Sequence, residues 1–188
     1  MSRSRILVTI SGAMMVLFGT WAVTQAETTP VSITQNVVPD TLVDGTSVAD
    51  FVGDQTTDNR YYRRYDLDGE FGLTGVFCAT SVDYGCQSAV GGSGGTQPLT
   101  LHTYCLDDGL PFLLEFLEMQ EEVITTVPDC QLEFFNTEIG GCCDSQTQSF
   151  VVEIHAEYCS ANPGICQNFW IGMNDLGQTA PSYLVCPP

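Results

Sequence analysis

Alternation of side chains between two faces, one of them mainly apolar, marks two segments in the middle and the last third of the chain. Leu99–Cys105 follows the two-residue period of a half-buried strand. Phe150–Tyr158 does the same, and its alternation places Glu153 and His155 on one face. Both segments therefore predict β-strands that contribute one face to a core.

Further segments rich in β-branched or aromatic residues are separated by turn residues. They lie at Tyr61–Tyr65, Gly75–Val82, Gln131–Phe135 and Asn168–Met173. Asp83–Gly85 is expected to close the second of them, and Gly91–Gly95 is expected to be a flexible loop. Short strands without helices between them indicate an all-β antiparallel sandwich or jelly roll.

Leu113–Val127 is ambiguous in its first half. Apolar residues with interspersed glutamates fit a helical face there, whereas the β-branched residues of Val123–Val127, ending at Pro128, favour a strand.

The first 26 residues have the three parts of a secretory signal. Arg3 and Arg5 give a basic start, an uncharged run extends from Ile6 to Val23, and Ala26 stands at the cleavage position. An uncleaved signal-anchor helix is the alternative, because the run is only slightly shorter than the ~20 residues of a bilayer span. Behind this leader we expect an N-terminal strand and connector over residues 27–57 and one sandwich domain over residues 58–188.

The charge of the chain excludes one class of partner. The formal net charge is −18, with 23 acidic residues against five basic ones. Such a surface repels phosphate backbones and anionic headgroups, so we expect no nucleic-acid binding, and membrane contact only through an uncleaved leader. The acidity suits a cation-rich exterior, and a simple role in solubility is the alternative.

Nine cysteines follow the leader, and an exported chain meets an oxidising compartment, so disulfides are expected. They are Cys78, Cys86, Cys105, Cys130, Cys142, Cys143, Cys159, Cys166 and Cys186. No C-x-x-C pair is present, which disfavours a zinc ribbon or a thioredoxin-like centre.

Only part of the disulfide pairing is predictable. Short loops favour two local bonds, Cys78–Cys86 and Cys159–Cys166. The neighbours Cys142 and Cys143 are expected to bond to different partners, because a vicinal disulfide strains the peptide between them. The pairing of the remaining cysteines stays open.

No catalytic constellation is predicted. Gly91–Gly95 contains the letters of the hydrolase nucleophile elbow, but its flanks lack the required strand and helix, so Ser93 is not expected to be a nucleophile. His102 and His155 lie mid-strand, where an imidazole packed or solvated on a sheet face is the expected state. We therefore expect a protein that is not an enzyme.

Acidic turns are the better candidates for a ligand site. Asp58, Asp66, Asp68 and Glu70 offer the oxygen ligands that a structural Ca²⁺ uses, although they lack the full EF-hand pattern. A solvated turn is the alternative, and no other cofactor is expected.

Arginines and tyrosines are interleaved within Arg60–Tyr65. Arg and Tyr are frequent interface anchors, yet pairing with the many carboxylates explains the arginines more simply. Exposed Tyr61, Tyr62, Phe169 or Trp170 would be the stacking rings of a carbohydrate-binding surface.

Several strings of the sequence resemble a β-sandwich module that is appended to large secreted bacterial proteins. They are Thr57–Leu67, Phe71–Gly75, Thr80–Asp83, Gly94–Leu101, Phe169–Gly172 and Gly177–Leu184. The resemblance covers roughly residues 55–188. It implies a jelly-roll-like accessory domain found beside proteases and surface-anchoring segments, with no catalytic residues of its own. Most of the cysteines depart from that family, which implies added cross-links.

The sequence as a whole predicts a non-catalytic interaction or structural module of the cell envelope, located in the periplasm, on the cell surface or outside the cell. Its expected partner is a protein, a surface polymer or a second copy. An uncleaved leader would instead make it an inner-membrane-anchored accessory subunit of an envelope complex. A carbohydrate-binding module is the other alternative.

Overall fold

The computed structural model describes residues 30–38, 41–45, 47–52, 55–91, 95–157, 168–173 and 177–186. Contacts within the chain separate residues 1–32 from a compact unit that begins at Ile33, and the fold of this second unit is described below. The predicted leader, the Cys159–Cys166 pair and Ser93 lie outside the described residues. Within the described ranges, no helix is long and apolar enough to span a bilayer.

Twelve strands and one short 3-10 helix form the described part of this unit. They are β1 (Phe51–Val52), β2 (Gln55–Thr56), β3 (Asn59–Tyr65), β4 (Val76–Cys78), β5 (Ser81–Val90), β6 (Thr96–Asp107), η2 (Leu114–Phe116), β7 (Glu118–Pro128), β8 (Cys130–Glu138), β9 (Cys142–Asp144), β10 (Gln148–Ala156), β11 (Asn168–Ile171) and β12 (Ser182–Val185).

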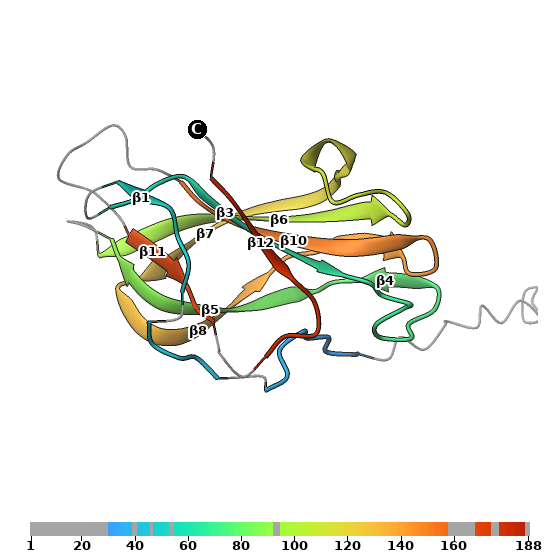
Figure 1. The fold of residues 1–188 in the computed structure, drawn as a ribbon, viewed down its shortest axis with the longest axis horizontal. Helices are drawn as coiled ribbons and strands as arrows, with labels where there is room; N and C mark the ends of the chain where they lie inside the picture. Colours follow the sequence, from blue (N-terminus) through green and yellow to red (C-terminus); the bar gives the residue numbers. More distant parts are fainter. Residues whose placement is uncertain are drawn as a thin grey trace, which may run out of the picture. The chain divides into compact units, whose positions relative to one another are not determined.

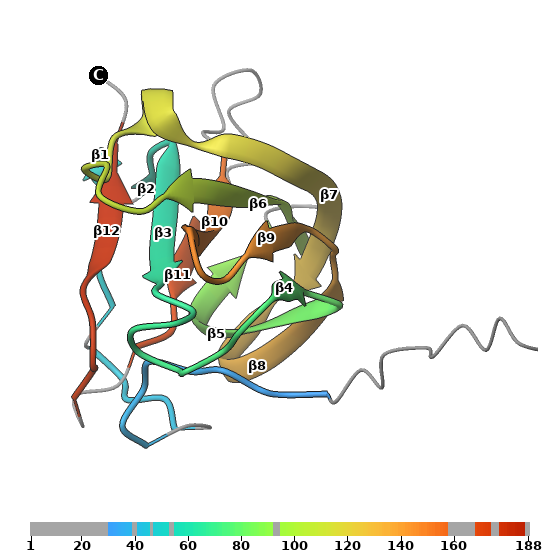
Figure 2. The same cartoon turned by 90° about the vertical axis from the view of Figure 1, so that its right-hand side faces the viewer.

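The strands pair in an antiparallel manner (Figures 1 and 2). One sheet has the order β12-β3-β10-β6-β7, a second has the order β11-β5-β8, and β4–β9 and β1–β2 form two-stranded sheets. Four pairs are nested along the chain: β3 with β10, β4 with β9, β5 with β8 and β6 with β7. A long antiparallel ribbon folded over on itself gives this order, which confirms the predicted sandwich of jelly-roll type.

The main core lies between the inner faces of the two larger sheets. Leu101 and Ile154 of the five-stranded sheet belong to one buried cluster with Tyr84 and Phe169 of the three-stranded sheet. Burying a side chain of this size contributes about 1.5–3 kcal/mol. All residues from Ser149 to Ala156 are buried, because β10 is the central strand and both of its faces are covered.

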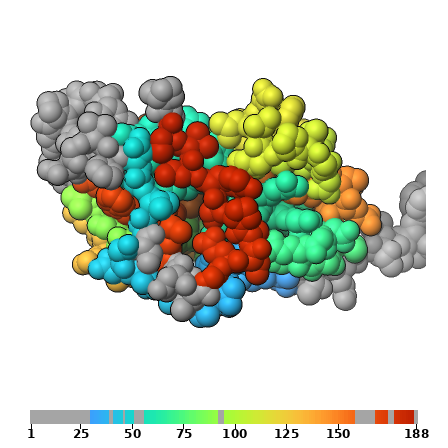
Figure 3. All heavy atoms as spheres, in the orientation of Figure 1, coloured from blue at the N-terminus to red at the C-terminus, as the bar shows by residue number. Residues whose placement is uncertain are grey.

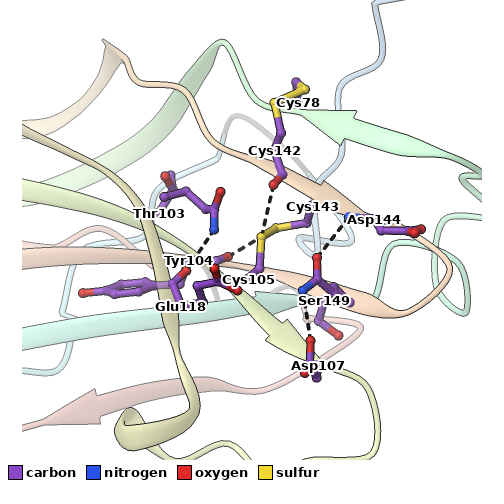
Figure 4. The surroundings of a disulfide bond; sticks show 12 residues. Cys78, Thr103, Tyr104, Cys105, Asp107, Glu118, Cys142, Cys143, Asp144 and Ser149 are labelled. Carbon is purple, nitrogen blue, oxygen red and sulfur yellow. Dashed lines mark hydrogen bonds between the residues drawn. A yellow bond between two sulfur atoms is a disulfide. The ribbon is translucent and has the colours of Figure 1, made fainter.

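Two disulfides join strands at one end of the sandwich (Figure 4). Cys78–Cys142 joins the paired strands β4 and β9, and Cys105–Cys143 joins β6 to β9 with a Cα–Cα distance of 5.7 Å. The neighbours Cys142 and Cys143 therefore have different partners, as predicted. The predicted Cys78–Cys86 bond is wrong, because Cys142 lies directly opposite Cys78 in the β4–β9 pair whereas Cys86 is buried in the main core.

Of two other predictions for strands, one is wrong and one is confirmed. Asp83–Gly85 does not close a strand but lies inside β5, because Tyr84 packs into the core and Asp83 accepts a hydrogen bond from Asn136 of the paired strand β8. The ambiguous segment contains the 3-10 helix η2 in its first half, and the strand predicted for its second half is confirmed as part of β7.

The described residues between Ile33 and the start of β3 belong to the same compact unit as the sandwich. The buried Gln35 donates hydrogen bonds from Nε2 to the backbone carbonyl of Arg64 and to Glu70, and the isolated bridge between Asn36 and Gln178 ties this segment to the C-terminal part. The expected connector is therefore packed against the sandwich from Ile33 onward.

Candidate functional site

One row of side chains crosses the outer face of the five-stranded sheet, one residue from each strand. In the order of the strands, the residues are Tyr183, Tyr62, Glu153, His102 and Glu122. The pleat that alternates side chains between faces places them opposite the core-facing set. Directly paired residues on one face are close neighbours, so this register assembles a polar row from distant parts of the sequence.

Glu153 is the centre of this row, and its side chain is fully buried. The hydroxyl of Tyr104 donates a hydrogen bond to Oε2, Arg60 Nη1 lies 3.6 Å from Oε1, and His102 Nδ1 lies 3.3 Å from Oε2. A buried carboxylate requires such partners, because an isolated charge in a protein interior is very costly.

The tyrosines around Glu153 are held in their neutral form. Burial raises the pKa of Tyr62 to about 12, and the negative charge of Glu153 contributes to the same shift. Burial, the hydrogen bond to Glu153 and the charge of Glu153 raise the pKa of Tyr104 well above its ordinary value. Both phenols therefore keep their protons at neutral pH, and the Tyr104 hydroxyl serves as a hydrogen-bond donor to Glu153.

Both histidines are buried, and each lies against a carboxylate, as expected for packed imidazoles. His102 Nε2 lies 2.9 Å from Glu122 Oε2, and His155 Nε2 contacts Asp58. Arg60 and Arg64 lie near Glu153 and Asp108, so pairing with carboxylates is confirmed for these two arginines. Arg63 instead donates to Ser182 and Asn36.

The segment that connects β6 to β7 covers one end of this face. Phe112 stacks on Tyr183 with 4.4 Å between the ring centroids and meets Tyr62 edge-on at 5.7 Å. Figure 3 shows the red residues of the C-terminal strand beside the yellow residues of this segment. Because Glu153 is sealed beneath its neighbours, its carboxylate holds strands together and does not meet a substrate in this conformation.

The predicted calcium ligands are not brought together. Asp66 accepts a hydrogen bond from the backbone of Gly69 in its own turn, Glu70 contacts Gln35 and Thr179, and Asp58 contacts His155. Asp68 is exposed. Across the described part of the chain, no three His, Cys, Asp or Glu side chains are grouped so as to hold a metal ion.

The predicted stacking rings are mostly inaccessible. Tyr61 is 8% exposed and packs edge-on against the buried Phe169, and Tyr62 is 3% exposed. The proposal of these three rings as a sugar-binding surface is wrong, because a sugar needs an exposed aromatic face. Trp170 lies on β11 opposite Ser88 and is half-buried.

Large exposed apolar side chains gather instead along one segment that runs from η2 into β7. We call this the β7 edge surface; it comprises Leu113, Leu114, Phe116, Met119 and Ile124 together with the exposed Glu115, Glu118 and Glu122. In the sheet order β7 lies at the margin, with β6 as its neighbour (Figure 2). Edge strands present unpaired backbone groups, which makes them templates for another strand.

Sequence reasoning missed this surface and the Glu153 row for the same reason. Both depend on which strands are neighbours, and alternation within one strand does not specify its neighbours. The signal that was present is the acidic Glu153 between the apolar residues Val151, Val152 and Ile154 of a predicted strand.

No family model, no curated protein sequence and no solved structure matches this chain.

Proposed function

We propose that this chain is a non-catalytic interaction module of the cell envelope, and that the β7 edge surface is where it binds its partner. The observation that carries the proposal is the 73% exposure of Ile124 on a strand at the margin of the sheet. Disulfides are compatible with an exported protein. The fully buried carboxylate of Glu153 supports a stable framework in place of a reactive pocket.

The geometry of β7 favours the addition of a strand between Glu121 and Val127. A bulge interrupts the pairing with β6 at Thr103 and Tyr104, before this stretch, and Pro128 ends it. Bulges and prolines protect edges from unwanted pairing, so the regular part of the edge lies between the two. Extended segments bind such edges through main-chain hydrogen bonds, and their alternate side chains give specificity.

Charge determines the kind of partner that this edge accepts. Glu118 and Glu122 flank exposed apolar residues, and the whole chain carries a formal net charge of −18. Pairing with a second copy would bring like charges together, which is unfavourable. The partner is therefore a protein segment in extended conformation that carries Lys or Arg beside apolar residues.

A site-specific cross-link tests this proposal with a matched control. A photo-cross-linking amino acid is placed at Ile124 or at Val76 of β4, which are 73% and 72% exposed. In native envelopes, we expect cross-links from position 124 to a segment rich in Lys or Arg, few from position 76, and lower yields in high salt. Equal yields at both positions, or a cross-linked segment that lacks basic residues, would contradict the proposal.

Neutral substitutions test whether the carboxylates of the β7 edge surface attract the partner. Replacing Glu118 and Glu122 together by Gln is expected to reduce the yield from position 124, because the attraction to a basic segment is lost. The control replaces Glu133 and Glu138 on β8, at the margin of the other large sheet, and is expected to leave the yield unchanged.

A further inference from the structure

Two cysteines outside the disulfides described above approach one another within the three-stranded sheet. Cys86 lies on β5 and is fully buried, and Cys130 is the first residue of β8. Their Sγ atoms are 2.7 Å apart. This observation is independent of the β7 edge surface and of the proposed function.

The regular register would keep these two side chains apart. Cys86 is paired with Glu133, and Cys130 is paired with Ala89, so the cysteines are three positions apart along the ladder. Because directly paired residues share a face and successive residues alternate, a separation of three places the two side chains on opposite faces. A local change of backbone direction is required to bring them together.

Both strands contain such a change between the two cysteines. On β8, Leu132 adopts a left-handed conformation with φ +53°, and it lies between Cys130 and Glu133. On β5, Cys86 and Ala89 both belong to the main core although they are three residues apart, and the pairing with β11 shifts register there. Both strands therefore exchange faces at this level, and Cys130 turns toward the buried face that holds Cys86.

The distance between the sulfurs is too short for two unbonded thiols. Carbon atoms in contact rest about 3.5–4.0 Å apart, and sulfur is the larger atom. A left-handed leucine is unfavourable by about 1–2 kcal/mol, so it is retained where the surrounding structure requires it. We infer that Cys86 and Cys130 form a third disulfide, which joins β5 to β8.

The bond forms by exchange with a disulfide oxidant of the exported compartment, either a protein or a small molecule. The Cys130 thiolate attacks one sulfur of the oxidant and releases a thiol, and the Cys86 thiolate then attacks the Cys130 sulfur and releases the second thiol. Cys86 and Cys130 lose two protons and two electrons, and the oxidant is reduced to two thiols. Burial raises the pKa of both cysteines in the folded chain, so the exchange takes place before the sheet closes.

Non-reducing peptide mapping of the full chain tests the bond directly. Trypsin is unsuitable, because the sequence has no lysine and no arginine after Arg64, so every cysteine falls in one tryptic peptide. Cleavage after Asp, Glu, Leu and aromatic residues instead separates Cys86 from Cys105 and releases a short peptide that begins at Cys130. We expect the Cys86 peptide to be linked to the Cys130 peptide. A link of either cysteine to any other position, or two alkylated thiols, would overturn the inference.

The number of free thiols rises or falls on substitution according to whether Cys86 and Cys130 are bonded or are two thiols. This test does not require the variant to fold. The unreduced chain is alkylated in denaturant, and the added groups are counted by intact mass. If the bond exists, Cys86→Ser raises the count by one because Cys130 is released; if both are thiols, it lowers the count by one. Cys105→Ser is the control, and it raises the count by one because it releases Cys143.

Discussion

Glu153 illustrates how a single residue organises the outer face of the five-stranded sheet. It lies on the central strand, its side chain is fully buried, and it contacts residues of both neighbouring strands: Arg60 of β3 and His102 and Tyr104 of β6. Its carboxylate therefore connects three strands, and the hydroxyl of Tyr104 is the donor that satisfies its Oε2.

The hydrogen bond from Tyr104 is expected to contribute measurably to stability. Tyr104→Phe keeps the ring but leaves Glu153 Oε2 without its hydroxyl donor, so the free energy of unfolding should fall by about 1–3 kcal/mol. Urea denaturation measures this change. Tyr183→Phe is the control and should stay within about 0.5 kcal/mol. Equal effects of the two substitutions would contradict a special role for the Glu153 network.

Alkaline pH is expected to destabilise the protein through its buried tyrosines. An unfolded tyrosine loses its proton near pH ~10, whereas the pKa of Tyr62 in the folded chain is raised to about 12 and that of Tyr104 is raised further. The unfolded state therefore binds fewer protons in this window, and the free energy of unfolding falls as the pH rises from about 10 to 12. Below pH ~10, Tyr62 and Tyr104 should not change the free energy of unfolding with pH. Tyrosinate absorbance that saturates near pH ~10 while the near-ultraviolet circular dichroism is unchanged would contradict this account.

At the scale of elements, β8 contains the most unusual backbone position described. Leu132 is the only non-glycine residue with a positive φ in the described ranges, and its side chain is 39% exposed. The face exchange that this residue permits accounts for the approach of Cys130 to Cys86.

The change in stability caused by a substitution at Leu132 is expected to depend on the backbone preference of the new residue more than on side-chain burial. Leu132→Asn should leave stability unchanged or raise it by up to about 1 kcal/mol, because Asn tolerates the left-handed region. Leu132→Val should lower stability by about 1–2 kcal/mol, because a β-branched residue does not. Thermal denaturation of both variants under oxidising conditions decides the order. A Val variant as stable as the Asn variant would show that the left-handed conformation is absent.

Alternation of side chains along the sequence predicts single strands but does not determine how the strands pair. The two-residue period of Leu99–Cys105 and of Phe150 onward predicted β6 and β10, because periodicity within a strand is a local property. The Cys78–Cys142 bond and the Glu153 row were not predictable, because both follow from strand pairing across long sequence separations. The prediction that Asp83–Gly85 closes a strand was wrong for a related reason. Packing of Tyr84 into the core overrides the turn preference of its neighbours.

For the whole molecule, charge is the dominant property. The formal net charge is −18, and the predicted calcium ligands are engaged with separate partners or exposed. Negative charges repel one another in the folded state, and salt weakens this repulsion as the Debye length falls from about 10 Å at 0.1 M to about 3 Å at 1 M.

Salt is therefore expected to stabilise the protein without ion specificity. The Tm should rise between 0.1 M and 1 M NaCl, and micromolar Ca²⁺ or its removal with EDTA should leave the Tm unchanged. Differential scanning calorimetry measures both. A clear rise of the Tm with micromolar Ca²⁺ would instead indicate a specific site of the kind that Asp58, Asp66, Asp68 and Glu70 were predicted to form.

We propose that this sandwich offers β7 as an edge to a basic, extended segment. Amide hydrogen exchange of the whole chain, with and without a synthetic peptide of the segment cross-linked at position 124, tests it most directly. We expect slow exchange in β10 in both states, and faster exchange in Glu121–Val127 that slows when the peptide is bound. Unchanged exchange in Glu121–Val127, with new protection elsewhere, would contradict the account.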